Sequence, residues 1–303
     1  MGATTAPLSV AAPAAIRNIL FATDFSPCSE VALPFAIALA KEHGASLFLT
    51  HILPAEPRYE LPLEPQRDEL NAAKQDAVHR FLAVIDSKEL SEVVHAPILR
   101  SGRFWQTMQE VIVERQIDFI VTGTRGRGGL SKLFLGSTAE LIFRNARCPV
   151  MTIGPHVRQE ILRGEAGAVV FATDFSAASM QAFPYAVGMA RQRGAPLILV
   201  HAVVPPVAAI ETVVLPTISD ELAQDARLRL TEIMRDYPDI PAEIIVSSRP
   251  SAEAIVEAAT GRNAAAIVLG VQHKGAMATH VPWSVADAVV GRAPCPVLTV
   301  RGD

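Results

Sequence analysis

The sequence predicts an α/β protein built of two tandem doubly wound domains, each a five-stranded parallel sheet flanked by helices. Two observations carry this prediction. The hexapeptide Phe-Ala-Thr-Asp-Phe-Ser occurs at residues 21–26 and again, letter for letter, at residues 171–176. In each half, short apolar segments alternate with helical patterns, which favours a parallel sheet covered on both faces. A repeat of nearly domain length indicates a duplicated domain, because solenoid repeats are much shorter.

Further matches between the halves define the expected domains. Cys148-Pro-Val150 recurs as Cys295-Pro-Val297, at an offset three residues shorter than that of the hexapeptide, so the middle loops differ in length. We expect a flexible tail at 1–15, a first domain at 16–154, a linker at 155–167 and a second domain at 168–301. A chain of 303 residues also suits two domains of about 150 residues each.

The elements of the first half follow from local patterns. The first strand is expected at 17–22, an apolar run that ends at a Thr-Asp turn. Ser26 as N-cap and Pro27 as the first helical residue start a helix, and Gly44 ends it. Apolar residues at helical spacing predict a helix over 64–85. The remaining expected elements are strands at 46–52, 93–99, 119–122 and 149–153, and helices at 104–114 and from Ser137.

Parallel sheets of this kind bind ligands at the carboxyl ends of their strands, where the strand order reverses. The residues that end the first two strands, Ala22, Thr23 and Ile52, are therefore candidate neighbours of a bound ligand. Asp24 follows directly after the first strand. A structural role for Asp24 stays open, because aspartate after a strand commonly bonds to its own turn.

A glycine-rich loop connects the fourth strand to the last helix of the first half. Its glycines can bring backbone N–H groups close to an anion, and Gly136-Ser137 opens a helix whose N-terminus favours phosphate. The loop is basic between its ends, with no acidic residue. It matches neither the P-loop nor the dinucleotide fingerprint. The candidate phosphate-binding residues are Gly123, Arg125, Gly126, Arg127, Gly136 and Ser137.

On these residues the chain resembles a tandem universal stress protein. The nucleotide signature of that family is Gly, two residues, Gly, nine residues and Gly-Ser or Gly-Thr, which Gly123, Gly126, Gly136 and Ser137 fit. The resemblance covers both halves. It implies an adenine nucleotide alpha hydrolase-like fold, ATP, ADP or AMP as ligand together with Mg²⁺, and pairing of domains through the last strand. It also implies that Asp24 lies beside the adenosine part of the ligand.

Alternative interpretations exist for single residues. Ser137-Thr-Ala-Glu140 has the form of a capping box, so Ser137 can serve the helix alone. In the second half Gly270 is retained, but His273 and Trp283 replace the second and third glycines. We therefore expect the second domain to be degenerate, with the Trp283 indole in the space of the phosphates, and one nucleotide bound per chain.

The leading functional hypothesis is a stress-related regulatory protein that binds ATP or another adenine nucleotide in its first domain. The second is a slow ATPase or phosphotransferase, although no residue is marked as a catalytic base. The third is a scaffold that dimerises without nucleotide. The last strands, at 149–153 and 296–300, are expected to form the contact between the two domains, and a homo-oligomer is expected.

Composition limits the class of protein. The net charge is −4 and the mean hydropathy +0.28, which indicates real cores and gives no sign of a nucleic-acid or membrane partner. Three scattered cysteines predict neither a disulfide framework nor a metal site, and they suit a cytoplasmic protein.

Overall fold

The computed structural model of the protein describes residues 15–55, 64–124, 136–165, 167–203, 215–272 and 285–302. Among these residues there are two compact units. The first unit comprises 15–165 together with 285–299, and the second unit comprises 167–272 together with 300–302.

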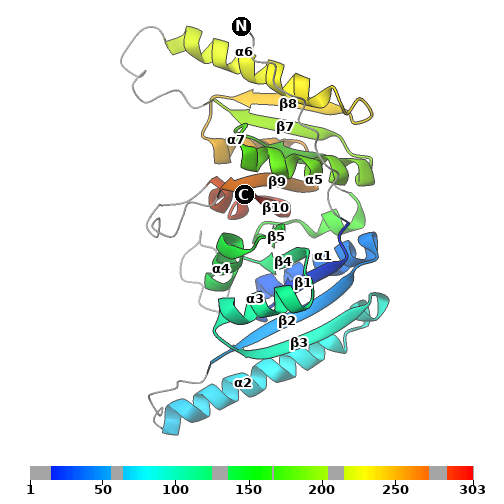
Figure 1. Ribbon diagram of the computed structural model, residues 1–303, viewed down its shortest axis with the longest axis vertical. Helices are drawn as coiled ribbons and strands as arrows, with labels where there is room; N and C mark the ends of the chain where they lie inside the picture. The colour runs from blue at the N-terminus through cyan, green and yellow to red at the C-terminus, as the bar shows by residue number, and fades with distance from the viewer. Residues whose placement is uncertain are drawn as a thin grey trace. The chain divides into compact units, whose positions relative to one another are not determined.

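The first half of the chain forms a parallel sheet in the strand order β3-β2-β1-β4-β5 (Figure 1). The predicted α/β class is confirmed, and α3 occupies the range that its pattern predicts. The third strand starts two residues later than expected and extends to Gly102. The elements are β1 (Asn18–Ala22), α1 (Pro27–His43), β2 (Ser46–Pro54), α2 (Glu64–Ile85), the 3₁₀ helix η1 (Lys88–Glu92), β3 (His95–Gly102), α3 (Phe104–Glu114), β4 (Phe119–Gly123), α4 (Ser137–Asn145) and β5 (Val150–Ile153).

Helix α1 has the caps that its sequence predicts. Ser26 is the N-cap, and its hydroxyl accepts a hydrogen bond from the backbone N–H of Ser29. Pro27 stands at the first helical position, where no backbone donor is needed. Gly44 ends the helix in the left-handed region, with φ of 61°. These caps hold the first turn of α1 at the carboxyl edge of the sheet.

The alternation of side chains along β1 divides the core of the first unit between two faces. Leu20 and Ala22 face a cluster that includes Met108 and Val111 of α3 and Ile142 of α4. Helices α3 and α4 therefore cover one face of the sheet (Figure 1). The intervening residues Ile19 and Phe21 are also fully buried. Burial on both faces makes the strands rigid and thereby fixes the positions of their ends.

The second half of the chain repeats these elements. Its strands pair in parallel in the order β9-β6-β7-β8. The caps recur as well, with Ser176 at the start of α5 and Gly194, at φ of 58°, at its end. The elements are β6 (Val169–Ala172), α5 (Ala177–Arg193), β7 (Leu197–Ala202), α6 (Leu215–Met234), β8 (Ala242–Ser247), α7 (Ser251–Gly261), β9 (Ala266–Gln272), α8 (Val285–Val290) and β10 (Val297–Gly302).

The sheet of the first unit includes residues from the end of the chain. Residues Val297–Thr299 of β10 pair antiparallel with β5, opposite Val150–Thr152. The last strands of the two sequence halves are thus hydrogen-bonded neighbours.

Two threonines of this antiparallel pair differ in their hydrogen bonds. Thr299 Oγ1 donates to Val150 O at 3.2 Å, whereas Thr152 Oγ1 is buried and has no partner among the described residues. A buried hydroxyl without a partner opposes folding. We expect Thr152→Val to raise the free energy of unfolding by about 1 kcal/mol and Thr299→Val to lower it by about 1 kcal/mol. Urea denaturation of both variants measures this, and an equal loss in both would contradict it.

The connection between the sequence halves is packed against the first unit. It contains the 3₁₀ helix η2 (Gln159–Arg163), in which Ile161 is only 4% exposed. The backbone N–H of Arg158 donates to Pro294 O at 3.1 Å. The polar segment expected as a linker is therefore anchored by a buried apolar side chain.

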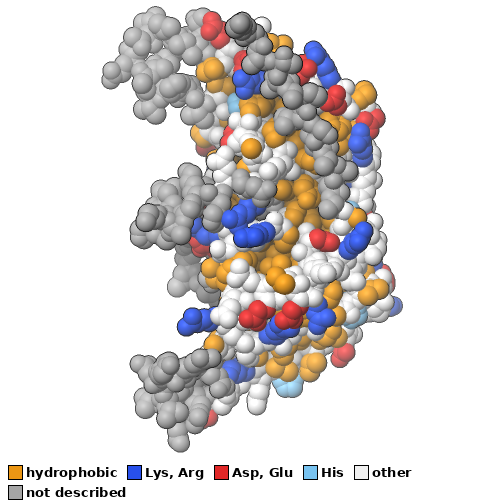
Figure 2. Space-filling view, in the orientation of Figure 1, with side chains coloured by type: hydrophobic (Ala, Val, Ile, Leu, Met, Phe, Trp, Pro, Cys, Tyr) orange, Lys and Arg blue, Asp and Glu red, His pale blue; other side chains and the backbone are white. Residues whose placement is uncertain are grey.

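Charges of both signs are interspersed with apolar side chains on the face shown in Figure 2. Among the described residues, no helix combines the length and apolarity needed to cross a membrane.

Candidate functional site

The strand order of the first unit reverses between β1 and β4. From β1 the chain continues to β2 and β3 on one side, while β4 and β5 lie on the other. The carboxyl ends of β1 and β4 are neighbours, with Ala22 paired to Thr122. Ligands bind in such folds at this edge. The structure therefore brings the candidates Ala22, Thr23 and Gly123 together at one place.

The turn after β1 is tied closely to β2. Thr23 N donates to Thr50 O at 3.0 Å, and Thr23 O lies 2.8 Å from His51 Nδ1. The His51 ring packs on Phe25, with 4.6 Å between the ring centroids. Phe25 has φ of 58°, a left-handed conformation that costs energy in a phenylalanine. Ile52, on β2, packs against the core cluster beneath α3 and α4.

Asp24 takes part in the hydrogen bonds of this turn. Its Oδ1 accepts from Ser26 N at 3.0 Å and from Ser29 Oγ at 2.5 Å. The structural role left open for Asp24 is thus realised by one carboxylate oxygen. Asp24 Oδ2 has no hydrogen bond with any described residue, and Asp24 is partly exposed.

Close packing explains the glycine at position 123. A Cβ atom there would lie 2.6 Å from Cys28 O and 2.9 Å from Ser29 N, in the first turn of α1. Gly270 is in the same position in the second half, where a Cβ would lie 2.2 Å from Ala178 O. The presence of glycine at both positions is therefore accounted for by the fold alone.

The glycine-rich loop begins and ends at one hydrogen bond. Gly136 N donates to Thr124 O at 2.5 Å, so the residue after β4 and the start of α4 are adjacent. The backbone N–H groups of the first turn of α4 thereby open at the carboxyl edge. The candidates Arg125, Gly126 and Arg127 lie outside the described residues.

The capping-box interpretation of Ser137 is wrong. Gly136 is extended, with φ of −61° and ψ of 152°, and its carbonyl accepts the first helical hydrogen bond from Glu140 N at 2.8 Å. Gly136 is therefore the N-cap and Ser137 the first helical residue. Glu140 instead forms an ion pair with Arg144 at 2.8 Å, one turn along α4.

Thr124 contributes a second polar feature to this edge. Its side chain is 3% exposed, and its Oγ1 has no hydrogen-bond partner among the described residues. Buried hydroxyls in native proteins are nearly always bonded, so one without a partner calls for an explanation. A ligand group at the adjacent loop would provide such a partner.

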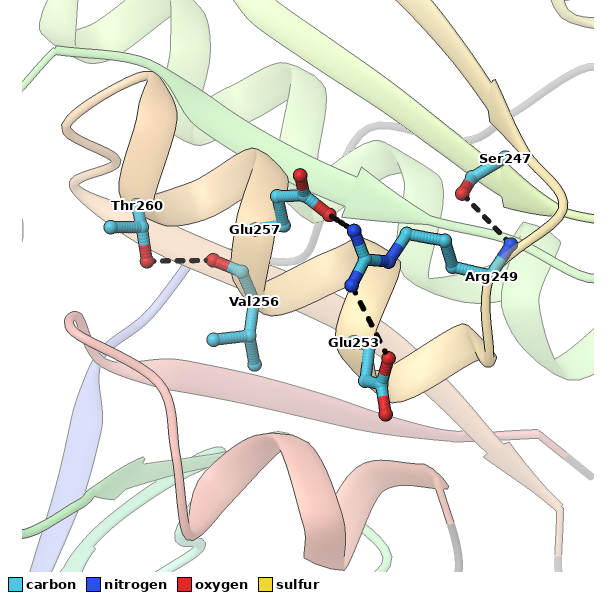
Figure 3. Close-up of polar contacts among 6 residues, drawn as sticks. All are labelled: Ser247, Arg249, Glu253, Val256, Glu257 and Thr260. Atoms are coloured by element: carbon cyan, nitrogen blue, oxygen red, sulfur yellow. Dashed lines mark hydrogen bonds and ion pairs between the residues drawn. The ribbon is translucent and has the colours of Figure 1, made fainter.

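The second unit differs at the turn that follows its β8 strand. Arg249 lies two residues before α7, and the equivalent position in the first unit, two residues before α3, is Gly102. Its guanidinium pairs with Glu253 at 3.7 Å and with Glu257 at 3.3 Å, both on α7 (Figure 3). This arginine is thereby occupied by carboxylates of its own unit. His273 and Trp283, on which the expected degeneracy depends, lie outside the described residues.

The described residues contain no group of three or more His, Cys, Asp or Glu side chains that could hold a metal ion. All three cysteines are free. Burial raises the pKa of the Cys148 and Cys295 thiols to about 12, which keeps both protonated and unreactive.

The universal stress protein family model matches residues 15–154 and again residues 166–301. The chain belongs to the universal stress protein family. Its tandem organisation is a duplication of that family's domain, as the repeated hexapeptide predicts.

Two relatives show how far the likeness extends along the chain. The universal stress protein Rv1996 of Mycobacterium tuberculosis is 27% identical over 94% of this chain and 95% of its own. Rv2005c of the same organism is 30% identical over 198 residues, which span 63% of this chain and 64% of that relative's length. A universal stress protein from Archaeoglobus fulgidus DSM 4304 has the same fold, with a TM-score of 0.68 at 19% identity, over 94% of this chain and 96% of that one.

Two functional candidates were missed by sequence reasoning. Thr124 was passed over because nothing in a sequence reveals that a hydroxyl is buried without a partner. Ser29 was also missed, although a signal for it exists. Serine occurs at both 29 and 179, at the same offset as the hexapeptide. The repeat therefore extends beyond the six consecutive identical residues.

Proposed function

We propose that this universal stress protein is a stress-related regulatory protein that binds ATP or another adenine nucleotide at the carboxyl edge of its first unit. The adenosine would lie between the ends of β1 and β2, beside Ala22, Thr23, Asp24 and Ile52. The phosphates would lie on the loop from Gly123 to Ser137. The second domain would serve the assembly without a nucleotide of its own.

The hydrogen bond between Gly136 N and Thr124 O is the observation that carries this proposal. It brings the start of α4 beside the end of β4, so that the third glycine of the signature bonds to the residue that follows the first. The helix N-terminus then supplies backbone donors and a favourable dipole for phosphate oxygens. The Thr124 hydroxyl, which has no partner among the described residues, adds one more group to the same place.

The residues of this edge fit a nucleotide better than a protein-bound metal. Helix N–H groups suit phosphate, whereas the described residues offer no carboxylate cluster. Mg²⁺ would be held chiefly by the nucleotide phosphates and water, and when bound it neutralises phosphate charge. Localisation in the cytoplasm and a homo-oligomeric state stay predictions.

Purified protein tests the proposal directly. Denaturation followed by mass spectrometry is expected to release an adenine nucleotide, and calorimetric titration with ATP to give one site per chain. The titration series includes cAMP, because a universal stress protein that is 24% identical over 44% of this chain (TM-score 0.32) has been solved in complex with cAMP. Failure of every adenine nucleotide to bind would overturn the proposal.

Gly126→Asp is expected to weaken ATP binding by about a hundredfold, because a carboxylate in the phosphate loop repels the ligand's charge. His273→Asp, at the matching position of the second half, is the control. It is expected to leave both affinity and stoichiometry unchanged. An equal loss in the two variants would assign the effect to folding or to a second site.

A further inference from the structure

We infer that Ser29 is a positioning residue of the nucleotide site, acting through the carboxylate of Asp24. This inference rests on the proposed function. Ser29 lies in the first turn of α1 and is 4% exposed, so it is shielded from a ligand at the sheet edge. Its effect on binding must pass through a neighbour.

The Ser29 hydroxyl bonds to Asp24 in two ways. Ser29 Oγ donates to Asp24 Oδ1 at 2.5 Å and accepts from Asp24 N at 3.3 Å. Ser26 N donates to the same carboxylate oxygen at 3.0 Å. One oxygen of Asp24 is therefore held by two donors. A carboxylate fixed in this way leaves Oδ2 in a single orientation toward the ligand.

The second half of the chain contains a natural comparison. Ser179 occupies the position of Ser29, and its backbone N–H bonds to the N-cap Ser176 as that of Ser29 bonds to Ser26. Its hydroxyl, however, donates to Ser176 O at 2.9 Å and lies 2.8 Å from Thr173 Oγ1. The two serines thus share the capping role, and the Ser179 hydroxyl also helps to lower the pKa of the Asp174 carboxyl. The halves differ in degree: Ser29 Oγ donates to Asp24 Oδ1 at 2.5 Å, whereas the close partners of Ser179 Oγ are Ser176 O and Thr173 Oγ1.

The close bond from Ser29 to Asp24 predicts a function for the hydroxyl beyond stability. Removing it leaves Asp24 Oδ1 with Ser26 N as its one donor among the described residues, so the carboxylate is held less firmly and a ligand must order it further on binding. The loss should therefore depend on the presence of Asp24. Loss of a purely structural serine would lower stability in both halves alike and leave affinity unchanged.

The test is a double-mutant cycle on the full chain with ATP titrated calorimetrically. Ser29→Ala is expected to weaken ATP binding by about fivefold to tenfold, through loss of preorganisation. Ser179→Ala is expected to leave it unchanged. In the Asp24→Ala background, Ser29→Ala should have no further effect on affinity, because the group that it positions has been removed. Thermal melting of each variant reports its stability separately.

The outcomes separate the two proposals. Failure of the unaltered protein to bind any adenine nucleotide overturns the proposed function and this inference together. ATP binding that is unchanged by Ser29→Ala, or weakened equally in the presence and absence of Asp24, overturns the inference alone. If Ser29→Ala does not fold, Ser29→Cys takes its place, because a thiol of similar size is a much weaker donor.

Discussion

Gly123→Ala is expected to lower the free energy of unfolding by about 3 kcal/mol, because the added methyl group has no room. The new Cβ would lie 2.6 Å from Cys28 O, a backbone atom that no side-chain rotation can move. Helix α1 is held there by its N-cap, and β4 is held between β1 and β5. Neither partner can retreat without breaking hydrogen bonds. Urea denaturation followed by circular dichroism measures the loss.

Two other glycines provide a parallel case and a control for this experiment. Gly270→Ala creates the same clash in the second unit, at 2.2 Å from Ala178 O, and should be as damaging. Gly261 has no atom within 4 Å of its Cβ position and lies at the end of α7, so Gly261→Ala should be neutral or slightly stabilising. A loss in Gly261→Ala as large as that in Gly123→Ala would show that packing at Gly123 is not the cause.

Ile161→Asp is expected to lower the free energy of unfolding by about 4 kcal/mol, since it buries a carboxylate in an apolar site. Ile161 is 4% exposed in η2, within the segment that joins the two sequence halves. The same change should expose this segment to limited proteolysis, because the apolar anchor that holds it against the first unit is lost. Equilibrium denaturation and the rate of cleavage within 155–165 measure both effects.

The neighbouring Gln159 provides the matched control for this prediction. It lies in the same 3₁₀ helix but is exposed, so Gln159→Asp adds the same charge without burying it. Its stability and its cleavage rate should match those of the unaltered protein. If Ile161→Asp were equally harmless, the segment would be a free linker, as its polar composition alone suggests.

Much of the fold follows from local sequence because local chemistry decides it. Ser26, Pro27 and Gly44 define α1 in the sequence and cap it in the structure, since capping depends on residues only a few positions apart. Apolar spacing predicts α2 to the residue. Ser137 shows where this reasoning fails. The local pattern predicts Ser137 as the N-cap, but Gly136 is the N-cap in the structure. Gly136 N bonds to Thr124 O across the glycine-rich loop, and a local pattern does not reveal such a bond.

The candidate site likewise has some features that the sequence predicts and others that it does not. The glycine spacing and the repeated Thr-Asp turn are visible in the sequence because they recur or match a known signature. The close bond from Ser29 to Asp24 is not visible there. Nor is the burial of the Thr124 and Thr152 hydroxyls, which have no partner among the described residues. They depend on which atoms the packing of helix on sheet brings within 3 Å.

The sequence by itself determined the duplicated α/β architecture, the caps of α1 and the position of the glycine-rich loop. Only the tertiary structure decided that Gly123 is required by the approach of α1, that Ile161 anchors the connecting segment, and that Ser29 bonds to Asp24. The physical reason is the sequence separation over which each kind of interaction acts. Periodicity and capping act over a few residues, whereas close packing and buried hydrogen bonds are set when distant segments of the chain meet.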